Sequence, residues 1–323
     1  MVSHRWFRNV AILKALVVAA GSFAWISVAP AQGPTSRGTL PGATTQRQVP
    51  NGYGSYSTVT ETEEIPVPDM FRTEAPLVER NIRFDYLYSH HLHEPLANES
   101  QFFTEVSYSF TERFGILFSA PYLIQDHFDG SQEDGFGDIA AGARYVVLGS
   151  EQEQPFKLAL GFNVFAPTGA VARELGEGQT YLEPELLTQF ILTDQTFSQL
   201  QLSLGVPTAD GGTTEFEYNT GVGYVFKNSP KTTLFSYPTL IAEVLGATGI
   251  GGAEAGTSIL DVAGGLRWTV GEKMFAGFGV SVPVTNQREF ETQYIFSLIY
   301  RYGVDPGTPV SSGVGAPSSR AYF

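Results

Sequence analysis

Strict alternation of apolar and polar side chains is the feature that most constrains how this chain can fold. Leucines at positions 200, 202 and 204 enclose Gln201 and Ser203, and the same period of two recurs along much of the chain. A period of two places successive side chains on opposite faces of a strand, whereas a helix needs a period of 3.6 residues. The pattern therefore predicts an all-β protein.

Twelve segments carry this alternation, and together they span residues 80–302. We place them at residues 80–88, 101–110, 114–123, 137–148, 156–166, 181–191, 197–206, 215–226, 234–245, 258–270, 274–282 and 290–302. Most are close to the roughly 9–11 residues that a tilted membrane-spanning strand needs. The expected fold is an up-and-down antiparallel transmembrane β-barrel of about twelve strands.

The connections between these segments fall into a short class and a long class. The short turns are residues 111–113, 149–155, 192–196 and 271–273, and the long loops are residues 89–100, 124–136, 167–180, 207–214 and 246–257. Short turns at one end and long loops at the other are typical of outer-membrane barrels, whose turns face the periplasm. The glycines at 249, 251 and 252 are expected to lie in flexible loop, because no Gly-Lys-Ser/Thr follows them.

A soluble β-sandwich also alternates, so the composition of the polar face decides between the two folds. That face carries many small residues, including Ser107, Gly142, Gly221 and Gly265, and charged residues make up 16% of the chain. Soluble domains carry about 25% charged residues. Aromatic residues reach 13%, and many lie near strand ends, as in interfacial girdles. The barrel is favoured, with a sandwich or lectin-like fold as the alternative.

The first 31 residues have the three parts of a cleavable export signal. Arg5, Arg8 and Lys14 form a basic start, residues 15–28 are apolar, and Ala29-Pro30-Ala31 offers a small-x-small cleavage site. The apolar run is shorter than the roughly 20 residues of a spanning helix, so an uncleaved anchor is the weaker alternative. We therefore expect export through a signal peptide and a location in the cell outer membrane.

Two further segments lie outside the predicted barrel and show no period. Residues 32–79 are rich in Gly, Pro, Thr and Gln, and residues 303–323 form a Gly/Pro/Ser-rich flexible tail. Such compositions favour an extended or disordered chain. The lead segment, residues 32–79, would equally suit a plug in the barrel mouth, and the sequence leaves both interpretations open. The terminal Phe323 imitates an assembly signal, but the residues before it do not alternate.

Composition excludes several function classes. The chain has no cysteine, which removes disulfides, thiolate metal sites and lipid attachment at cysteine. Its net charge is −14, so nucleic acid is not an expected partner. The expected partners are outer-membrane lipid and a small-molecule solute of unknown identity. No cofactor is predicted, and the oligomeric state stays open.

Charged side chains gather on the face opposite the apolar one. A charge on the lipid face costs about 2–4 kcal/mol at mid-bilayer, so these groups are expected to line the lumen. They are Arg83, Asp85, Glu105, Asp138, Arg144, Glu183, Glu185, Glu217, Glu243, Asp261, Arg267 and Arg301. One hypothesis is an acid-biased pathway for cations or polar solutes. The other is a salt-bridged lumen that only maintains the barrel.

Four histidines lie in the first two predicted long loops, at His90, His91, His93 and His127. Imidazole clusters bind Zn, Cu or Ni, but this spacing matches no standard site, so these are weak metal candidates and solvated loop residues are the simpler interpretation. No Gly-x-Ser-x-Gly nucleophile elbow occurs in the sequence. We therefore do not expect an enzyme.

Three short motifs resemble a known family. They are the segments 135–145 (GFGDIAAGARY), 162–169 (FNVFAPTG) and 118–122 (FSAPY). Together they are similar to the outer-membrane β-barrel family named for the meta-pathway of phenol degradation, and the resemblance spans about residues 80–302. It implies an outer-membrane channel or transporter for hydrophobic or aromatic solutes, without implying phenol itself.

Three functions follow from the sequence as hypotheses. The first is a channel for passive passage of small solutes through the outer membrane. The second is a structural or surface-binding barrel without conduction, whose long loops meet a partner. An outer-membrane enzyme is the third and the least expected.

Overall fold

The computed structural model describes residues 39–50, 56–91, 95–149, 155–229, 232, 234–252, 254–271 and 273–302. The predicted signal peptide, residues 1–31, and the predicted tail, residues 303–323, lie outside the described residues, as does His93. No helix within the described ranges is long and apolar enough to cross a membrane.

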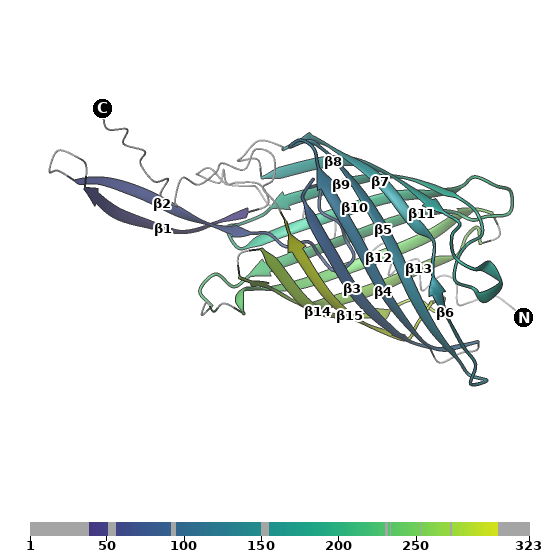
Figure 1. The fold of residues 1–323 in the computed structure, drawn as a ribbon. Helices are drawn as coiled ribbons and strands as arrows, with labels where there is room; N and C mark the ends of the chain where they lie inside the picture. The colour runs from purple at the N-terminus through teal and green to yellow at the C-terminus, as the bar shows by residue number, and fades with distance from the viewer. Residues whose placement is uncertain are drawn as a thin grey trace, which may run out of the picture. The chain divides into compact units, whose positions relative to one another are not determined.

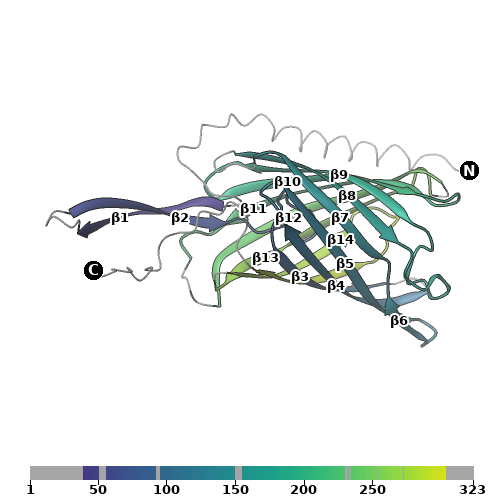
Figure 2. The same ribbon diagram turned by 45° about the horizontal axis from the view of Figure 1, so that its top comes forward.

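Twelve of the described strands form a closed antiparallel barrel (Figures 1 and 2). In chain order they are β3 (Asn81–His90), β4 (Leu96–Ser109), β5 (Phe114–His127), β7 (Ile139–Leu148), β8 (Phe156–Ala166), β9 (Tyr181–Ile191), β10 (Thr196–Pro207), β11 (Thr214–Val225), β12 (Ser236–Gly251), β13 (Ser258–Val270), β14 (Met274–Pro283) and β15 (Thr292–Arg301). Each barrel strand pairs with the next one along the chain. The predicted fold class is confirmed.

The pair β15 and β3 closes the ring. These two strands are in antiparallel register from Thr292, opposite His90, to Arg301, opposite Asn81. Closure matters in a lipid environment, where each unpaired backbone amide costs several kcal/mol. The barrel therefore presents no open sheet edge along its wall between the first and last strands.

The apolar face of the strands points outward. Phe84, Phe162, Leu240 and Phe296 are between 45% and 53% exposed, although they are large apolar side chains. The alternating polar positions point inward and are buried, as Gln199 shows. A soluble sandwich has the opposite arrangement, so these strands carry the inverted pattern of a barrel that faces lipid.

Several predicted loops are shorter in the structure, because the strands continue beyond their alternating parts. The prediction that residues 124–136 form a loop is wrong: β5 runs to His127 and pairs with the short strand β6 (Gln132–Phe136). Likewise β12 continues to Gly251, so Gly249 lies in a strand and not in flexible loop. Strand pairing uses only backbone groups, so it extends past the point where apolar side chains stop.

The lead segment contains a two-stranded antiparallel sheet of its own. Strand β1 (Thr39–Pro50) pairs with β2 (Tyr56–Pro66), from Thr39 opposite Pro66 to Pro50 opposite Tyr56. The sequence interpretation treated this stretch as extended chain and did not predict the pairing. Val67 follows β2 directly, so the hairpin is covalently continuous with the segment described next.

Candidate functional site

Residues 67–80, which we name the plug segment, lie inside the barrel without forming a strand. Val67, Met70 and Phe71 are almost completely buried and belong to one apolar cluster. The barrel side of that cluster comes from five strands, through Leu87, Phe197, Val225, Ile241 and Ile295. Contacts with β3, β10, β11, β12 and β15 at once place the plug segment across the lumen.

The carboxylate of Glu243 on β12 binds the tip of the plug segment. Its Oε1 accepts a hydrogen bond from the amide of Phe71 at 2.6 Å. Its Oε2 accepts from the amides of Arg72 at 3.1 Å and Thr73 at 2.9 Å, and from the Thr73 hydroxyl at 3.0 Å. Glu243 is only 2% exposed. A buried carboxylate needs such donors, and charge-assisted bonds of this kind are the strong ones.

Two glutamines of β10 extend this contact on either side. The amide of Met70 donates to Oε1 of Gln199 at 3.4 Å, and the amide of Glu74 donates to Oε1 of Gln201 at 3.2 Å. Five consecutive backbone amides, from residue 70 to residue 74, are therefore bound by three barrel side chains. A segment held this way is fixed by side-chain acceptors and not by a β-ladder.

Glycines on the inner wall make room for the apolar anchors of the plug segment. A Cβ atom added at Gly265, Gly277 or Gly279 would lie 2.7, 3.0 or 3.1 Å from the ring of Phe71. The Arg267 guanidinium covers the same ring, with its carbon 4.9 Å from the ring centroid. Small residues of the polar face thus form a socket for one phenylalanine.

Two arginines bind carbonyl groups of the plug segment. Arg83 donates to the carbonyl of Phe71 and pairs with Asp85 at 2.6 Å. Arg144 donates to the carbonyls of Ala75 at 3.1 Å and Leu77 at 3.4 Å. The same guanidinium also forms ion pairs with Glu74 of the plug and, at 3.1 Å, with Glu185 of β9. The barrel therefore binds both amide groups and carbonyl groups of the plug backbone.

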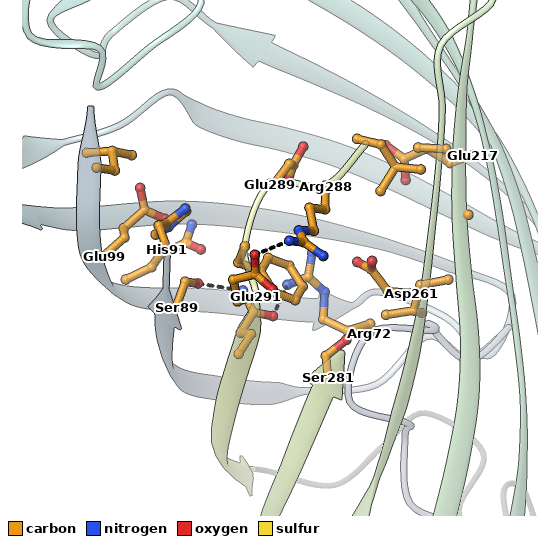
Figure 3. A pocket seen from close by; sticks show the side chains of 18 of the residues that line it. Arg72, Ser89, His91, Glu99, Glu217, Asp261, Ser281, Arg288, Glu289 and Glu291 are labelled. Carbon is orange, nitrogen blue, oxygen red and sulfur yellow. Dashed lines mark hydrogen bonds and ion pairs between the residues drawn. The ribbon is translucent and has the colours of Figure 1, made fainter. Parts of the chain in front are cut away.

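The plug segment separates two cavities. On the long-loop side lies a cavity of about 610 Å³, which we name the outer chamber; Arg72 of the plug lines it (Figure 3). On the short-turn side lies a cavity of about 40 Å³, lined in part by Asp69 and Glu74 of the plug together with Glu105 and Arg144. Residues 69–74 therefore stand between the two spaces.

The predicted lumen charges occupy different places along the barrel. Arg83, Asp85, Glu185, Glu243 and Arg267 are buried at the level of the plug. Glu217 and Asp261 line the outer chamber, and Glu105 and Arg144 line the smaller cavity. Glu183 accepts a hydrogen bond from Asn163 at 3.0 Å, and Arg301 pairs with Glu79 at 2.8 Å.

Asp138 has contacts that differ from those of the other predicted lumen charges. Its carboxylate accepts hydrogen bonds from the amides of Gly169 and Glu177, both at 2.8 Å. Both donors belong to the loop between β8 and β9. Asp138 therefore holds that loop against the end of β7, and its contacts are those of a loop anchor.

The three candidate metal ligands that the structure describes do not form a metal site. His90 lies next to Asn98, with 2.9 Å between Nδ1 and Oδ1, and His91 lines the outer chamber. His127 ends β5. Among the described residues, no group of three or more His, Asp or Glu side chains is arranged to hold a metal ion.

Sequence reasoning missed the anchoring residues of the plug segment. Met70 and Phe71 form the one pair of adjacent large apolar residues between the prolines at 68 and 76. That pair was the available signal, because a disordered segment has little use for two large apolar side chains. Glu243, which binds the amide of Phe71, was predicted to face the lumen, but nothing in the sequence indicates what it binds.

Comparison with known proteins gives structural likenesses only. No family model and no curated protein matches this sequence. The COG4313 outer membrane channel from Pseudomonas putida F1 is similar in structure, with 12% identity, a TM-score of 0.52, and 73% of this chain and 100% of that chain covered. At this identity the likeness shows the fold, which is that of an outer-membrane β-barrel.

Two porins resemble the barrel less closely. A KdgM porin has 13% identity and a TM-score of 0.44, with 69% of this chain and 99% of that chain covered. The NanC porin has 9% identity and a TM-score of 0.46, with 70% of this chain and 100% of that chain covered.

Proposed function

We propose that this protein is a channel for small solutes in a bacterial-type outer membrane, that it is exported by its signal peptide, and that the plug segment closes it. The channel conducts when residues 67–80 leave the lumen. In this proposal the protein is a passive facilitator and not an enzyme. The outer-membrane channel of similar fold supports the proposal.

One observation carries the proposal: the plug segment is bound by side chains and takes no part in the β-ladder. Each barrel strand pairs with two neighbouring barrel strands, and none of these pairings involves the plug segment. The tip is bound by Glu243, Gln199 and Gln201, whose hydrogen bonds with the plug can be exchanged for hydrogen bonds with water. A barrel whose interior served only to maintain its shape would not need a separable segment with chambers on both sides.

The solute class is a finer part of the proposal. Resemblance to the meta-pathway family implies hydrophobic or aromatic solutes, and Leu245, Ile259 and Phe290 give the outer chamber apolar patches. The chamber also carries several carboxylates, which favour a positively charged or polar solute. We propose passage of small molecules that combine an apolar body with a polar or cationic group.

Single-channel recording in planar bilayers tests the proposal. Glu243→Gln removes the charge that binds the plug tip, and its amide nitrogen cannot accept the amide donors of residues 71–73. We expect wild type to be mostly closed, and both this variant and a deletion of residues 68–77 to conduct for a larger fraction of the time.

Glu183→Gln is the matched control, since Glu183 is a lumen carboxylate that accepts a hydrogen bond from Asn163 of the barrel. It should conduct like wild type. If the Glu243→Gln variant and the deletion both fold, yet neither conducts, the channel proposal fails and a non-conducting structural or surface-binding barrel replaces it.

A further inference from the structure

The outer chamber has a wall built by four adjacent strands. Pairing in the sheet places Glu217 of β11 opposite Ala247 of β12, and Ala247 opposite Ile259 of β13. Asp261 lies two residues beyond Ile259 on the same strand face. Side chains that are directly opposite in an antiparallel pair share a face, so these groups face the chamber together, as the lining of the cavity also shows.

This wall has an apolar centre between two carboxylates. β11 and β13 are separated by β12, and Asp261 is offset by two residues along β13, so the Cα atoms of Glu217 and Asp261 are about 12 Å apart at a strand spacing of about 4.8 Å. Leu245, Ala247 and Ile259 lie between and beside them and line the same cavity. Figure 3 shows Glu217 and Asp261 on the same side of the chamber.

The chamber carries an excess of negative charge. Its lining contains six carboxylates against the two arginines Arg72 and Arg288. The carboxylates are Glu99, Glu215, Glu217, Asp261, Glu289 and Glu291. With neutral histidine the lining therefore has four more negative than positive groups. A lined cavity of one sign concentrates ions of the opposite sign.

Four of these six carboxylates form no close ion pair, and Arg72 of the plug reaches Glu217 and Asp261 only through a longer-range Coulomb attraction. Arg288 pairs with Glu291, and Glu99 accepts a hydrogen bond from Gln125 at 3.0 Å. Within the described part of the chain, Glu217 and Asp261 form no hydrogen bond and no ion pair within 4 Å, and the same holds for Glu215 and Glu289. Their negative charge is thus directed at whatever enters the chamber.

A second, independent feature of the wall also indicates a ligand. Ser281 on β14 is 1% exposed and lines the chamber, and its hydroxyl has no hydrogen-bond partner among the described residues. The Oδ1 atom of Asp261 is likewise shielded and has no partner among them. Buried polar atoms are usually hydrogen-bonded, so these two atoms on one wall retain the capacity to bind a polar group that enters the chamber.

The arrangement favours an extended organic cation over a metal ion. Among the described residues, no three carboxylates or imidazoles are close enough together to hold one metal ion. Two separate carboxylates with an apolar strip between them match a chain with a positive group at each end. The geometry points to the outer chamber as a binding site for short alkyl diamines, with Glu217 and Asp261 each taking one ammonium group and the chain lying on Leu245 and Ala247.

Isothermal titration calorimetry on the full chain in detergent tests this site, with 1,5-diaminopentane, pentylamine and 1,5-pentanediol as probes. We expect the diamine to bind about fivefold more tightly than the monoamine, as for the loss of one partly exposed charge pair. The diol, which has the same length and no charge, should not bind. Equal binding of diamine and diol would overturn the inference.

A matched pair of double variants separates the local site from the general negative charge. Glu217→Gln with Asp261→Asn should weaken diamine binding at least tenfold. Glu174→Gln with Asp210→Asn removes the same charge from exposed groups on the same end, neither of which lines the chamber, and should leave binding unchanged. If both double variants weaken diamine binding equally, the diamine is attracted by the general negative charge and there is no local binding site.

The inference deepens the proposed channel, because it names a solute class for one of its chambers. Its test measures equilibrium binding and needs no conduction. If the protein binds diamines but never conducts, the binding site stands and the channel proposal fails. If it conducts without discriminating diamine from diol, the channel proposal stands and the binding site fails.

Discussion

At the scale of single residues, two kinds of inner-wall residue hold the plug segment: glycines that leave space and side chains that accept hydrogen bonds. Gly279 and its neighbours provide space, and Glu243 provides the negative group that binds the amides of the plug tip. The two requirements are met on different strands, so each can be removed without touching the other. Closure therefore depends on a few identifiable positions and not on the general polarity of the lumen.

Gly279→Ala is expected to loosen the plug segment while leaving the barrel intact. A Cβ at this position would lie within 3.1 to 3.3 Å of three atoms of the Phe71 ring, and those are its three nearest contacts. Overpacking of this kind costs about 1–3 kcal/mol. Hydrogen exchange of the amides of residues 71–73 should become faster.

Gly264→Ala is the control for that experiment, because the nearest atom to its added Cβ is the carbonyl oxygen of Ile241 at 3.6 Å. Its exchange rates at residues 71–73 should equal those of wild type. Unchanged exchange in Gly279→Ala would mean that the Phe71 socket does not hold the plug tip.

At the scale of elements, the plug segment and the barrel strands are stabilised by different interactions. Neighbouring strands share regular backbone ladders, such as the ten residue pairs between β10 and β11. The plug segment has instead a buried apolar pair, acceptors at its tip and two arginines on its carbonyls. An element of this kind is expected to open at a lower free energy than the barrel strands.

A disulfide between the plug segment and β5 should hold the channel closed. Cβ of Val78 is 3.2 Å from the Cβ that would be added at Gly115, slightly below the usual separation of about 3.5–4.5 Å in disulfides. Val78→Cys with Gly115→Cys, introduced into a chain that has no other cysteine, should reduce the conductance of the Glu243→Gln variant when oxidised. Reduction should restore it in the same bilayer.

The single variant Gly115→Cys, treated in the same way, controls for the bulk of the added side chain. It should respond to neither oxidation nor reduction. Full conductance of the oxidised double-cysteine variant would show that residues after position 77 need not move for the channel to open.

The sequence was sufficient to predict the barrel, because the alternation that predicts each strand lies within that strand. Period-two alternation in stretches such as residues 181–191 predicted β9 at its observed bounds, and the charges opposite the apolar face were assigned to the lumen from the same parity. Where alternation stops, as after Leu123, strand pairing continues through the backbone alone, and the predicted loop was wrong.

The plug segment could not be predicted in the same way, because its contacts are remote in sequence. Phe71 and Glu243 are 172 residues apart, and Met70 and Gln199 are 129 apart. No local pattern in residues 67–80 specifies an acceptor on β12 or a glycine socket on β13 and β14. The paired carboxylates of the outer chamber became visible only once the register of β11, β12 and β13 was known.

At the scale of the whole molecule, the barrel and the plug segment are two structurally separate parts. The ring from β3 to β15 is complete without any residue before Asn81. The plug adds an interior that divides the lumen into two cavities. The barrel can therefore remain unchanged while the interior is rearranged.

Deletion of residues 68–77 should leave a folded barrel. Because the ladder does not include these residues, the variant should keep its β-sheet circular dichroism and the heat-dependent shift in gel mobility of a folded barrel. A lower melting temperature is expected, since Glu243 loses the four donors it binds. Complete loss of the heat-dependent shift would mean that the plug is required for the barrel to fold.

The plug segment is joined to β2 at one end and to β3 at the other, and this covalent continuity governs how closure recovers. When the plug leaves its seat it stays tethered at the mouth, so its return is a unimolecular step at high effective concentration. Rebinding then needs no partner and does not depend on how much protein is present. In the proposed mechanism, closed is consequently the resting condition of each individual molecule, and any open interval is set by how long the plug is kept from returning.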